Sequence, residues 1–234
     1  MVALAVVGLV SPKALQHAML WWLLVALAIL RVIADWPMAD NHGYLLCYWL
    51  LAIALCRSSV ELEDTLTRNA RLLIGLTFAF ASLWKVLLSP DYLDGTFLRI
   101  SMATDVRFET FAHLAAGLDA VELQTLREHL HSGGSIGGAG ELTRYHAVAM
   151  IATGWNVFIN LALACAFLGL PWIARTRNIL LIVYCTVTYA VATVDGFAWL
   201  LISMGIAQTD RVQVRTIAGF VAVFILVLGY RAWA

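Results

Sequence analysis

Two titratable side chains stand where apolar segments of this chain begin or end. His42 directly precedes an apolar run at residues 43–56, and Lys85 lies near the end of another run at 70–88. An ionisable group at the edge of such a run is costly to place in a membrane, so it is a candidate for function. A lysine amine that has lost its proton acts as a general base, and a nearby histidine orients a substrate or holds a charge.

Each of these residues also has a structural interpretation. Lys85 is long enough to extend its ammonium to the membrane surface while its methylene chain stays in apolar surroundings. His42 is placed to cap a helix or to hydrogen-bond a lipid headgroup. The sequence leaves these alternatives open.

The composition indicates an integral membrane protein. The 234 residues are 62% hydrophobic and 13% charged, whereas a soluble domain is nearer half apolar and a quarter charged. The formal net charge is zero, so no basic surface for nucleic acid is expected. Only two of the basic residues are lysines, Lys13 and Lys85.

Apolar runs predict an all-α bundle of about six transmembrane helices in a single domain, residues 1–234. Residues 1–10 are apolar without a basic start, so we expect them at the interface rather than in a cleaved signal peptide. The fifth run is long and contains Asp195, where we expect a kink or break. The predicted spans are 13–33, 43–56, 70–88, 146–170, 178–206 and 216–233.

Basic residues predict the orientation of this bundle. With six spans both termini share one side, and the more basic side faces the cytoplasm. We therefore expect both termini in the cytoplasm and the long 89–145 connection outside. The cytoplasmic side would hold Lys13, Arg57, Arg68, Arg71, Arg175, Arg177 and Arg231, against Arg31, Arg211 and Arg215 opposite.

The 89–145 connection contains a segment with helical periodicity. Residues 108–131 predict one amphipathic helix that lies on the membrane surface or caps the bundle, with a partner-binding helix as the alternative. Its expected apolar face comprises Leu114, Leu118, Val121, Leu126 and Leu130.

Span directions place further polar residues near Lys85. Asp195 falls in the outer half of the fifth span, and Asn156 and Asn160 lie at similar or greater depth on the fourth. Polar groups at such depth are expected to face the bundle interior, so we expect His42 and Lys85 to line one pocket at the outer leaflet, within about 10 Å of each other. Asp195 alternatively pairs with an arginine or binds backbone amides at a helix break. Because access to such a pocket is lateral from the bilayer, its ligand would be lipophilic, for example a quinone or hydroquinone.

Metal-binding patterns are weak in this chain. His129 and His131 are two residues apart and point to different faces of one helix, so no metal site is expected. The four cysteines lie in or beside apolar runs without CxxC spacing, and we interpret them as packing residues.

Two short motifs resemble a known family. The Asn-His-Gly-Tyr-Leu stretch at residues 41–45 is similar to the Asn-His-x-Tyr-Leu signature of vitamin K-dependent gamma-carboxylases and of bacterial relatives carrying the horizontally transferred transmembrane (HTTM) domain. The Ala-Ser-Leu-Trp-Lys stretch at 81–85, followed by Pro-Asp-Tyr-Leu-Asp-Gly at 90–95, resembles the second signature of that family. The resemblance implies that Lys85 deprotonates a hydroquinone, that His42 is required nearby, and that Asn41 and Tyr44 support the site.

The resemblance also limits the expected activity. The carboxylases are several times longer, and their large extracytoplasmic region, which holds propeptide and glutamate, has no counterpart in these 234 residues. We therefore expect a membrane bundle that binds a quinone-like ligand, located in a bacterial cytoplasmic membrane, rather than a glutamate carboxylase. If the protein is an enzyme, it would be a carboxylase-like or quinone-linked membrane enzyme. The alternative is a non-catalytic subunit that packs against membrane protein partners.

Overall fold

The computed structural model describes residues 11, 13–57, 61–133, 143–169, 171–192 and 194–233, without the side chains of Asp195 and of residues 231–233. All regular secondary structure within these residues is helical. Residues 1–10, predicted to be interfacial, lie outside the described part. The long helices are α2 (Ala18–Ala34), α3 (Asn41–Cys56), α4 (Leu62–Leu83), α9 (Thr143–Leu168), α10 (Arg177–Val191), α11 (Asp195–Ala207) and α12 (Val214–Trp233).

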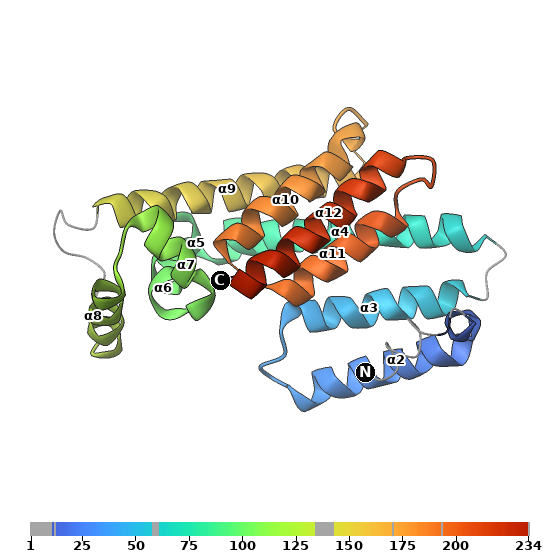
Figure 1. Ribbon diagram of the computed structural model, residues 1–234, viewed down its shortest axis with the longest axis horizontal. Coiled ribbons are helices and arrows are strands. Elements are labelled where there is room, and N and C mark those ends of the chain that lie inside the picture. The colour runs from blue at the N-terminus through green and yellow to red at the C-terminus, as the bar shows by residue number, and fades with distance from the viewer. Residues whose placement is uncertain are drawn as a thin grey trace.

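Successive helices of these seven run in opposite directions along the bundle (Figure 1). Contacts at one end join the start of α4 to the end of α11, where the Thr67 hydroxyl donates to the Ala207 carbonyl at 3.2 Å. The Gln208 amide there also donates to Asn178 at the start of α10. We call this the arginine end and define it by Arg57, Arg71, Arg177 and Arg211. The opposite, lysine end is defined by His42, Lys85 and Gly196.

The predicted fifth span is wrong as a single helix. The break at Asp195 exists, but it reverses the chain: α10 ends at Val191 and α11 begins at Asp195. Gln208, directly after α11, returns to Asn178 in the first turn of α10, so the two helices form a hairpin. The bundle therefore has seven helices rather than six.

The reversal also places the first and last helices of the bundle differently from the six-span prediction, in which both ends share one side. The start of α2 lies at the arginine end, where the Arg57 guanidinium donates to the Gln16 carbonyl at 2.8 Å. The end of α12 lies at the lysine end, where the Tyr230 hydroxyl donates to the Ala190 carbonyl at 3.2 Å. The two ends of the bundle-forming chain are thus on opposite sides (Figure 1).

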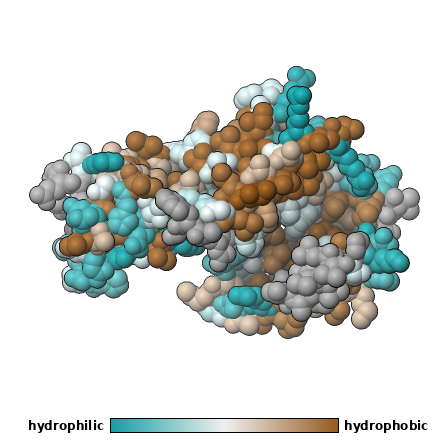
Figure 2. Space-filling view, in the orientation of Figure 1, coloured by the Kyte–Doolittle hydropathy of each residue, from teal (hydrophilic) through white to brown (hydrophobic). Residues whose placement is uncertain are grey.

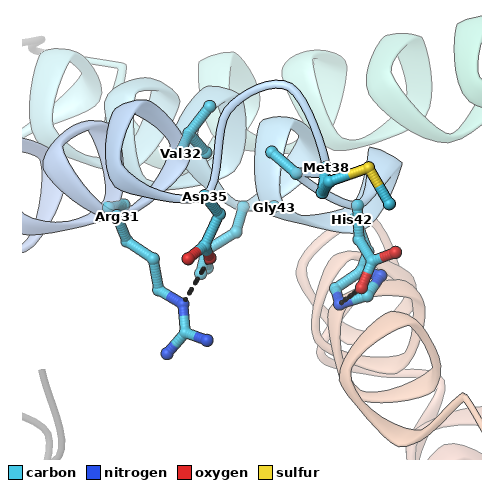
Figure 3. Close-up of a pocket in the computed structure, with 10 residues that line it drawn as sticks. Arg31, Val32, Asp35, Met38, His42 and Gly43 are labelled. Carbon is cyan, nitrogen blue, oxygen red and sulfur yellow. Dashed lines mark hydrogen bonds and ion pairs between the residues drawn. The ribbon is translucent and has the colours of Figure 1, made fainter.

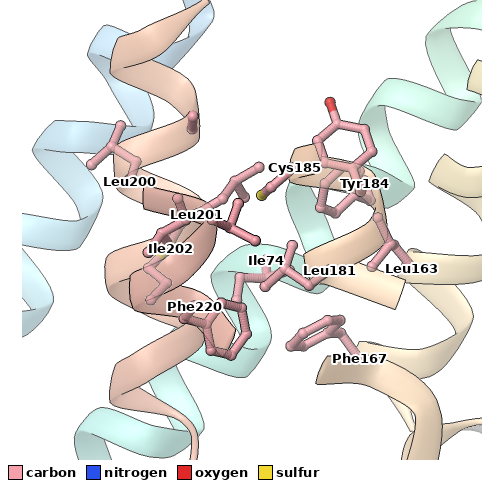
Figure 4. Packing of buried hydrophobic residues seen from close by; sticks show 14 of the residues in the cluster. Ile74, Leu163, Phe167, Leu181, Tyr184, Cys185, Leu200, Leu201, Ile202 and Phe220 are labelled. Atoms are coloured by element: carbon pink, nitrogen blue, oxygen red, sulfur yellow. The ribbon is translucent and has the colours of Figure 1, made fainter. Parts of the chain in front are cut away.

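The apolar core lies where α4, α9, α10, α11 and α12 meet (Figure 4). Ile74, Leu163, Leu181, Leu201 and Phe220 are each at most 1% exposed there. α2 packs mainly on α3, through a separate small cluster that includes Leu24, Ala28, Leu50 and Ala54. The α2–α3 hairpin is thus attached to the side of the main bundle.

Residues 89–133 form a group of short helices beside the start of α9 (Figure 1). The helix predicted over 108–131 is wrong in its first half, because Gly117 adopts a left-handed conformation with φ 75° and ends the preceding segment. Asp119 and Glu122 then form a capping box that starts a new helix. The short elements are α5 (Pro90–Leu93), α6 (Thr96–Thr104), η3 (Val106–Phe108), α7 (Glu109–Phe111), η4 (Ala112–Ala116) and α8 (Ala120–His131).

This connection has a core that uses only part of the predicted apolar face. Leu114 and Val121, expected on that face, are 67% and 74% exposed. Leu118, expected on the same face, is buried and packs with Leu123, with Met102 of α6 and with residues of α9, and Leu126 is partly buried against this cluster. Arg127 of α8 joins this helix to α6 and α7. Its guanidinium donates to the Ala103 carbonyl at 2.7 Å and pairs with Glu109.

Two helices are long and apolar enough to cross a membrane by length and composition: Leu62–Leu88, which joins α4 to the π-helical segment η2 (Trp84–Leu88), and Thr143–Leu168. Four others, Ala18–Ala34, Asn41–Cys56, Gly196–Ala207 and Val214–Tyr230, are apolar but shorter. Hydrophobic residues extend over the surface of the bundle, and hydrophilic ones gather around α8 and at the arginine end (Figure 2).

Candidate functional site

Lys85 lies in η2, a single π-helical turn that continues α4. Such turns occur inside α-helices with one extra residue and are frequent at functional sites. The neighbours Trp84, Leu87 and Leu88 are 61%, 68% and 60% exposed, whereas Lys85 is half-buried. Lys85 therefore faces the protein while its apolar neighbours face outward. A surface helix of a soluble protein has the opposite arrangement, with its polar residues outward.

The Lys85 ammonium binds a polar row on α9. Its Nζ donates to the Oδ1 of Asn156 at 2.7 Å, and the Nδ2 of Asn160 donates to the same oxygen at 2.9 Å. Thr153, Asn156 and Asn160 share one face of α9, since they are spaced by three and four residues. The Oγ1 of Thr153 and the Oδ1 of Asn160 are buried without a hydrogen-bond partner among the described residues. This row therefore retains unused hydrogen-bonding capacity.

Tyr92 of α5 provides the second contact of Lys85. The ammonium lies 5.3 Å from the centroid of its ring, within the range of a cation–π interaction. The Tyr92 side chain is buried, and burial raises the pKa of its hydroxyl, so it remains a neutral phenol. Its ring stacks on Phe97 with the centroids 5.2 Å apart.

A tight turn fixes Tyr92 beside α9. Gly95 has φ 77°, and an added Cβ there would lie 2.6 Å from the Sδ of Met150. Asp94 stabilises the same turn because its Oδ1 accepts a hydrogen bond from the Thr96 amide at 2.8 Å. Both the conformation and the close approach to α9 require glycine.

His42 lies at the other candidate position, in the first turn of α3. Its Nε2 is 3.7 Å from the Oδ2 of Asp40, and its ring packs against Gly196 at the start of α11. It lines a cavity of about 540 Å³ between the ends of α2 and α3 (Figure 3). Asp35, which pairs with Arg31 at 3.2 Å, lines the same cavity.

The lengths of α3 and of the joined α4 and η2 place His42 and Lys85 at different heights along the bundle. Lys85 lies 23 residues after Leu62, whereas His42 lies only 14 residues before Cys56. At about 1.5 Å per residue, Lys85 is roughly 13 Å further along the bundle from the shared turn. Lys85 is not among the residues that line the His42 cavity. A single pocket for both residues therefore stays a prediction.

The structure brings only some of the predicted site residues together. Asn156 and Asn160 join Lys85 directly. Asn41 is exposed at the first residue of α3 and Tyr44 is half-buried, and neither is among the contacts of Lys85. Asp195 begins α11 at the lysine end, but its side chain lies outside the described part of the structure.

Sequence reasoning missed the aromatic groups around Lys85. Tyr92 was not expected to be a site residue, although an aromatic residue seven positions after a conspicuous lysine is a usable signal. Deeper in the bundle Phe78 packs edge-on against Tyr184, with the centroids 4.8 Å apart, and Phe197 lies 6.5 Å from Phe78.

Comparison with known proteins adds no assignment: no protein-family model, curated protein or solved structure matches this chain. Within the described residues no group of three or more His, Cys, Asp or Glu is placed to hold a metal ion.

Proposed function

We propose that this protein is an integral membrane protein that binds a quinone-like lipophilic ligand at Lys85. The membrane part of the proposal is supported by the outer surface of the bundle. Phe80, Ile151 and Phe158, on the two longest apolar helices, are 65%, 72% and 63% exposed. In the most apolar window of Leu62–Leu88, only 22% of residues are buried. The core helix of a soluble protein would bury such residues, since soluble monomers rarely expose large apolar patches.

The seven-helix order supports an orientation with the arginine end in the cytoplasm. Arg211 lies beside Glu63 at this end, and Arg215 follows it within the first turn of α12. The reversal at residues 192–194 thus moves both to the side that already holds Arg57, Arg71, Arg175 and Arg177. Arg31 remains at the lysine end, and position 231, at the end of α12, moves there. Because basic residues are retained in the cytoplasm, the lysine end and the end of α12 would face outward.

The observation that carries the ligand proposal is the set of contacts of Lys85. This half-buried ammonium is bound by a neutral amide oxygen and a neutral aromatic face, and none of the described carboxylates lies within 4 Å of it. A quinone oxygen would supply the missing acceptor and would reach the site through the lipid-facing side of η2. The buried donors and acceptors of the α9 row would then orient the ligand.

The same contacts suit proton transfer from a hydroquinone. In that step the ligand O–H bond breaks and an N–H bond forms on a neutral Lys85 amine, leaving an ammonium and a hydroquinone anion. Asn156 would hold the amine in place before transfer, and Tyr92 would stabilise the ammonium afterwards through its ring face. The resemblance to the gamma-carboxylase family assigns the same role to Lys85.

The proposal is tested by quinone binding in lipid nanodiscs. A photoreactive menaquinone analogue should label residues around η2 or the Thr153–Asn160 face of α9, and Lys85→Ala should weaken binding by about tenfold or more, the loss typical of a hydrogen bond to a charged group. Lys85→Arg should retain part of the binding but lose any turnover, because a guanidinium does not give up its proton. Lys13→Ala, the change at the other lysine, is the matched control.

His42→Ala separates the one-pocket prediction from two independent sites. If a single quinone touches both residues, this variant should weaken labelling at η2 as well. Equal binding by the wild type and Lys85→Ala would refute the quinone site. It would support the alternative of a non-catalytic subunit, for which loss of a co-purifying membrane protein would be the relevant measurement.

A further inference from the structure

Two arginines converge at the arginine end, on the opposite side of the bundle from Lys85. Arg71 extends from α4 and Arg177 from the first residue of α10, and both are half-buried. Arg71 reaches the Gln208 carbonyl at 3.3 Å, and Gln208 in turn binds Asn178, the residue after Arg177. The ends of α4, α10 and α11 are thereby tied together around the two guanidinium groups.

The charges at this point are not balanced by the protein. Arg177 interacts electrostatically with the like charge of Arg71 and with one carboxylate, that of Asp210. None of the described carboxylates lies within 4 Å of either guanidinium. Two positive charges therefore face one negative charge at longer range, which leaves a net attraction for an anion.

Arg71 also has a hydrogen-bond donor to spare. Its Nη2 is used by Gln208, but its Nε is buried and has no partner among the described residues. A buried unpaired donor on a charged group is costly. An oxyanion that accepted from Nε would remove that cost, and arginine binds phosphate through two such donors at once.

We propose that Arg71 and Arg177 form a binding site for the phosphate of an anionic phospholipid headgroup. The surroundings favour a lipid over free phosphate, because Trp172 and Ile179, five residues before and two residues after Arg177 in the sequence, are 75% and 64% exposed and offer apolar surface to acyl chains at this end of the bundle. Basic pockets between membrane helices on the cytoplasmic side bind anionic headgroups in this way. The site shares the proposed membrane embedding but is independent of the ligand at Lys85.

Native mass spectrometry of the detergent-purified protein tests the site by titration with phosphatidylglycerol, phosphatidylcholine or inorganic phosphate. Phosphatidylglycerol should bind the wild type about tenfold more tightly than phosphatidylcholine does. Arg177→Gln should remove that preference, since it deletes one of two charges without deleting a described hydrogen bond. Arg71→Lys keeps the charge but loses the second donor, so it should weaken binding less than Arg177→Gln.

Arg175→Gln is the matched control, because this exposed arginine lies two residues from Arg177. It should leave the preference within about twofold of wild type. Thermal unfolding in phosphatidylcholine identifies variants that fail to fold. Equal binding of the two lipids, binding of inorganic phosphate alone, or an equal loss in Arg175→Gln would overturn the proposal. A quinone site that failed at Lys85 would leave these outcomes unchanged.

Discussion

The Nζ of Lys85 lies 2.7 Å from the Oδ1 of Asn156, so the end of α4 is joined to the middle of α9 by a charge-assisted hydrogen bond. The same oxygen accepts from Asn160, which is 1% exposed. Asn156 is therefore the shared acceptor of a buried row, and its removal has consequences at two positions.

Asn156→Ala should lower the free energy of unfolding by about 1–3 kcal/mol, because it leaves a half-buried ammonium and a buried amide without their acceptor. Asn156→Asp should recover part of this loss by supplying a carboxylate to Lys85. Thermal unfolding in detergent measures both. Phe158→Ala, on the exposed face of the same helix, is the control, and an equal loss there would show that the row has no special role.

Gly95→Ala should destabilise the protein by at least 1–2 kcal/mol, because φ 77° is strained for alanine and its Cβ would lie 2.6 Å from Met150. Gly133→Ala separates the two causes. Gly133 has a similar φ of 83° but open space around its Cβ position, so this variant reports the backbone cost alone. If the two variants lose the same stability, the contact with Met150 does not constrain the turn that holds Tyr92.

The connection between η2 and α9 should lose stability in acid through Asp105. Its hydrogen bonds from Arg107 hold the pKa of its carboxyl below the ordinary value. A group with a depressed folded pKa contributes stability above its unfolded pKa, about 4, and loses it as pH falls through the folded value.

Asp105→Asn should therefore cost a few tenths to about 1 kcal/mol at pH 7, since the pair is partly exposed, and should reduce the loss of stability below pH 4. Chemical unfolding followed at pH 3–7 provides the measurement. Asp91→Asn, at an exposed position in α5, is the control. A pH profile unchanged by Asp105→Asn would contradict the assignment to this pair.

The reversal at residues 192–194 predicts that Arg175 and Arg211 lie on the same side of the membrane. On a cysteine-free background, Arg175→Cys and Arg211→Cys should be protected alike from a membrane-impermeant maleimide in intact cells, while Ser132→Cys should react. A single fifth span would instead place residues 175 and 211 on opposite sides. Opposite reactivity at these two positions would restore the six-span topology.

The sequence by itself determined the helical character of the chain and part of the polar site. The apolar runs at 43–56, 146–170 and 216–233 became helices close to their predicted bounds, because burial of apolar side chains and satisfaction of the backbone both favour helix there, whereas the helix of the 70–88 run begins at Leu62 and the 178–206 run divides into α10 and α11. Span direction predicted that Lys85, Asn156 and Asn160 lie in the same half of the bundle, but the contact of Lys85 with the middle of α9 comes from the packing of the two helices.

Only the tertiary structure decided the direction of the chain after Val191 and the positions that depend on it. A break near Asp195 is visible in the sequence, but a kink and a reversal have the same local signal, because packing of the following helix selects between them. The side reached by Arg211 depends on that choice, as does the contact of Arg71 with Gln208, which follows α11. The contact between Tyr92 and Lys85 also depends on packing, because the turn at Gly95 that positions Tyr92 fits closely against Met150. Gly95 and Met150 are 55 residues apart, and such a contact leaves no periodic pattern in the sequence.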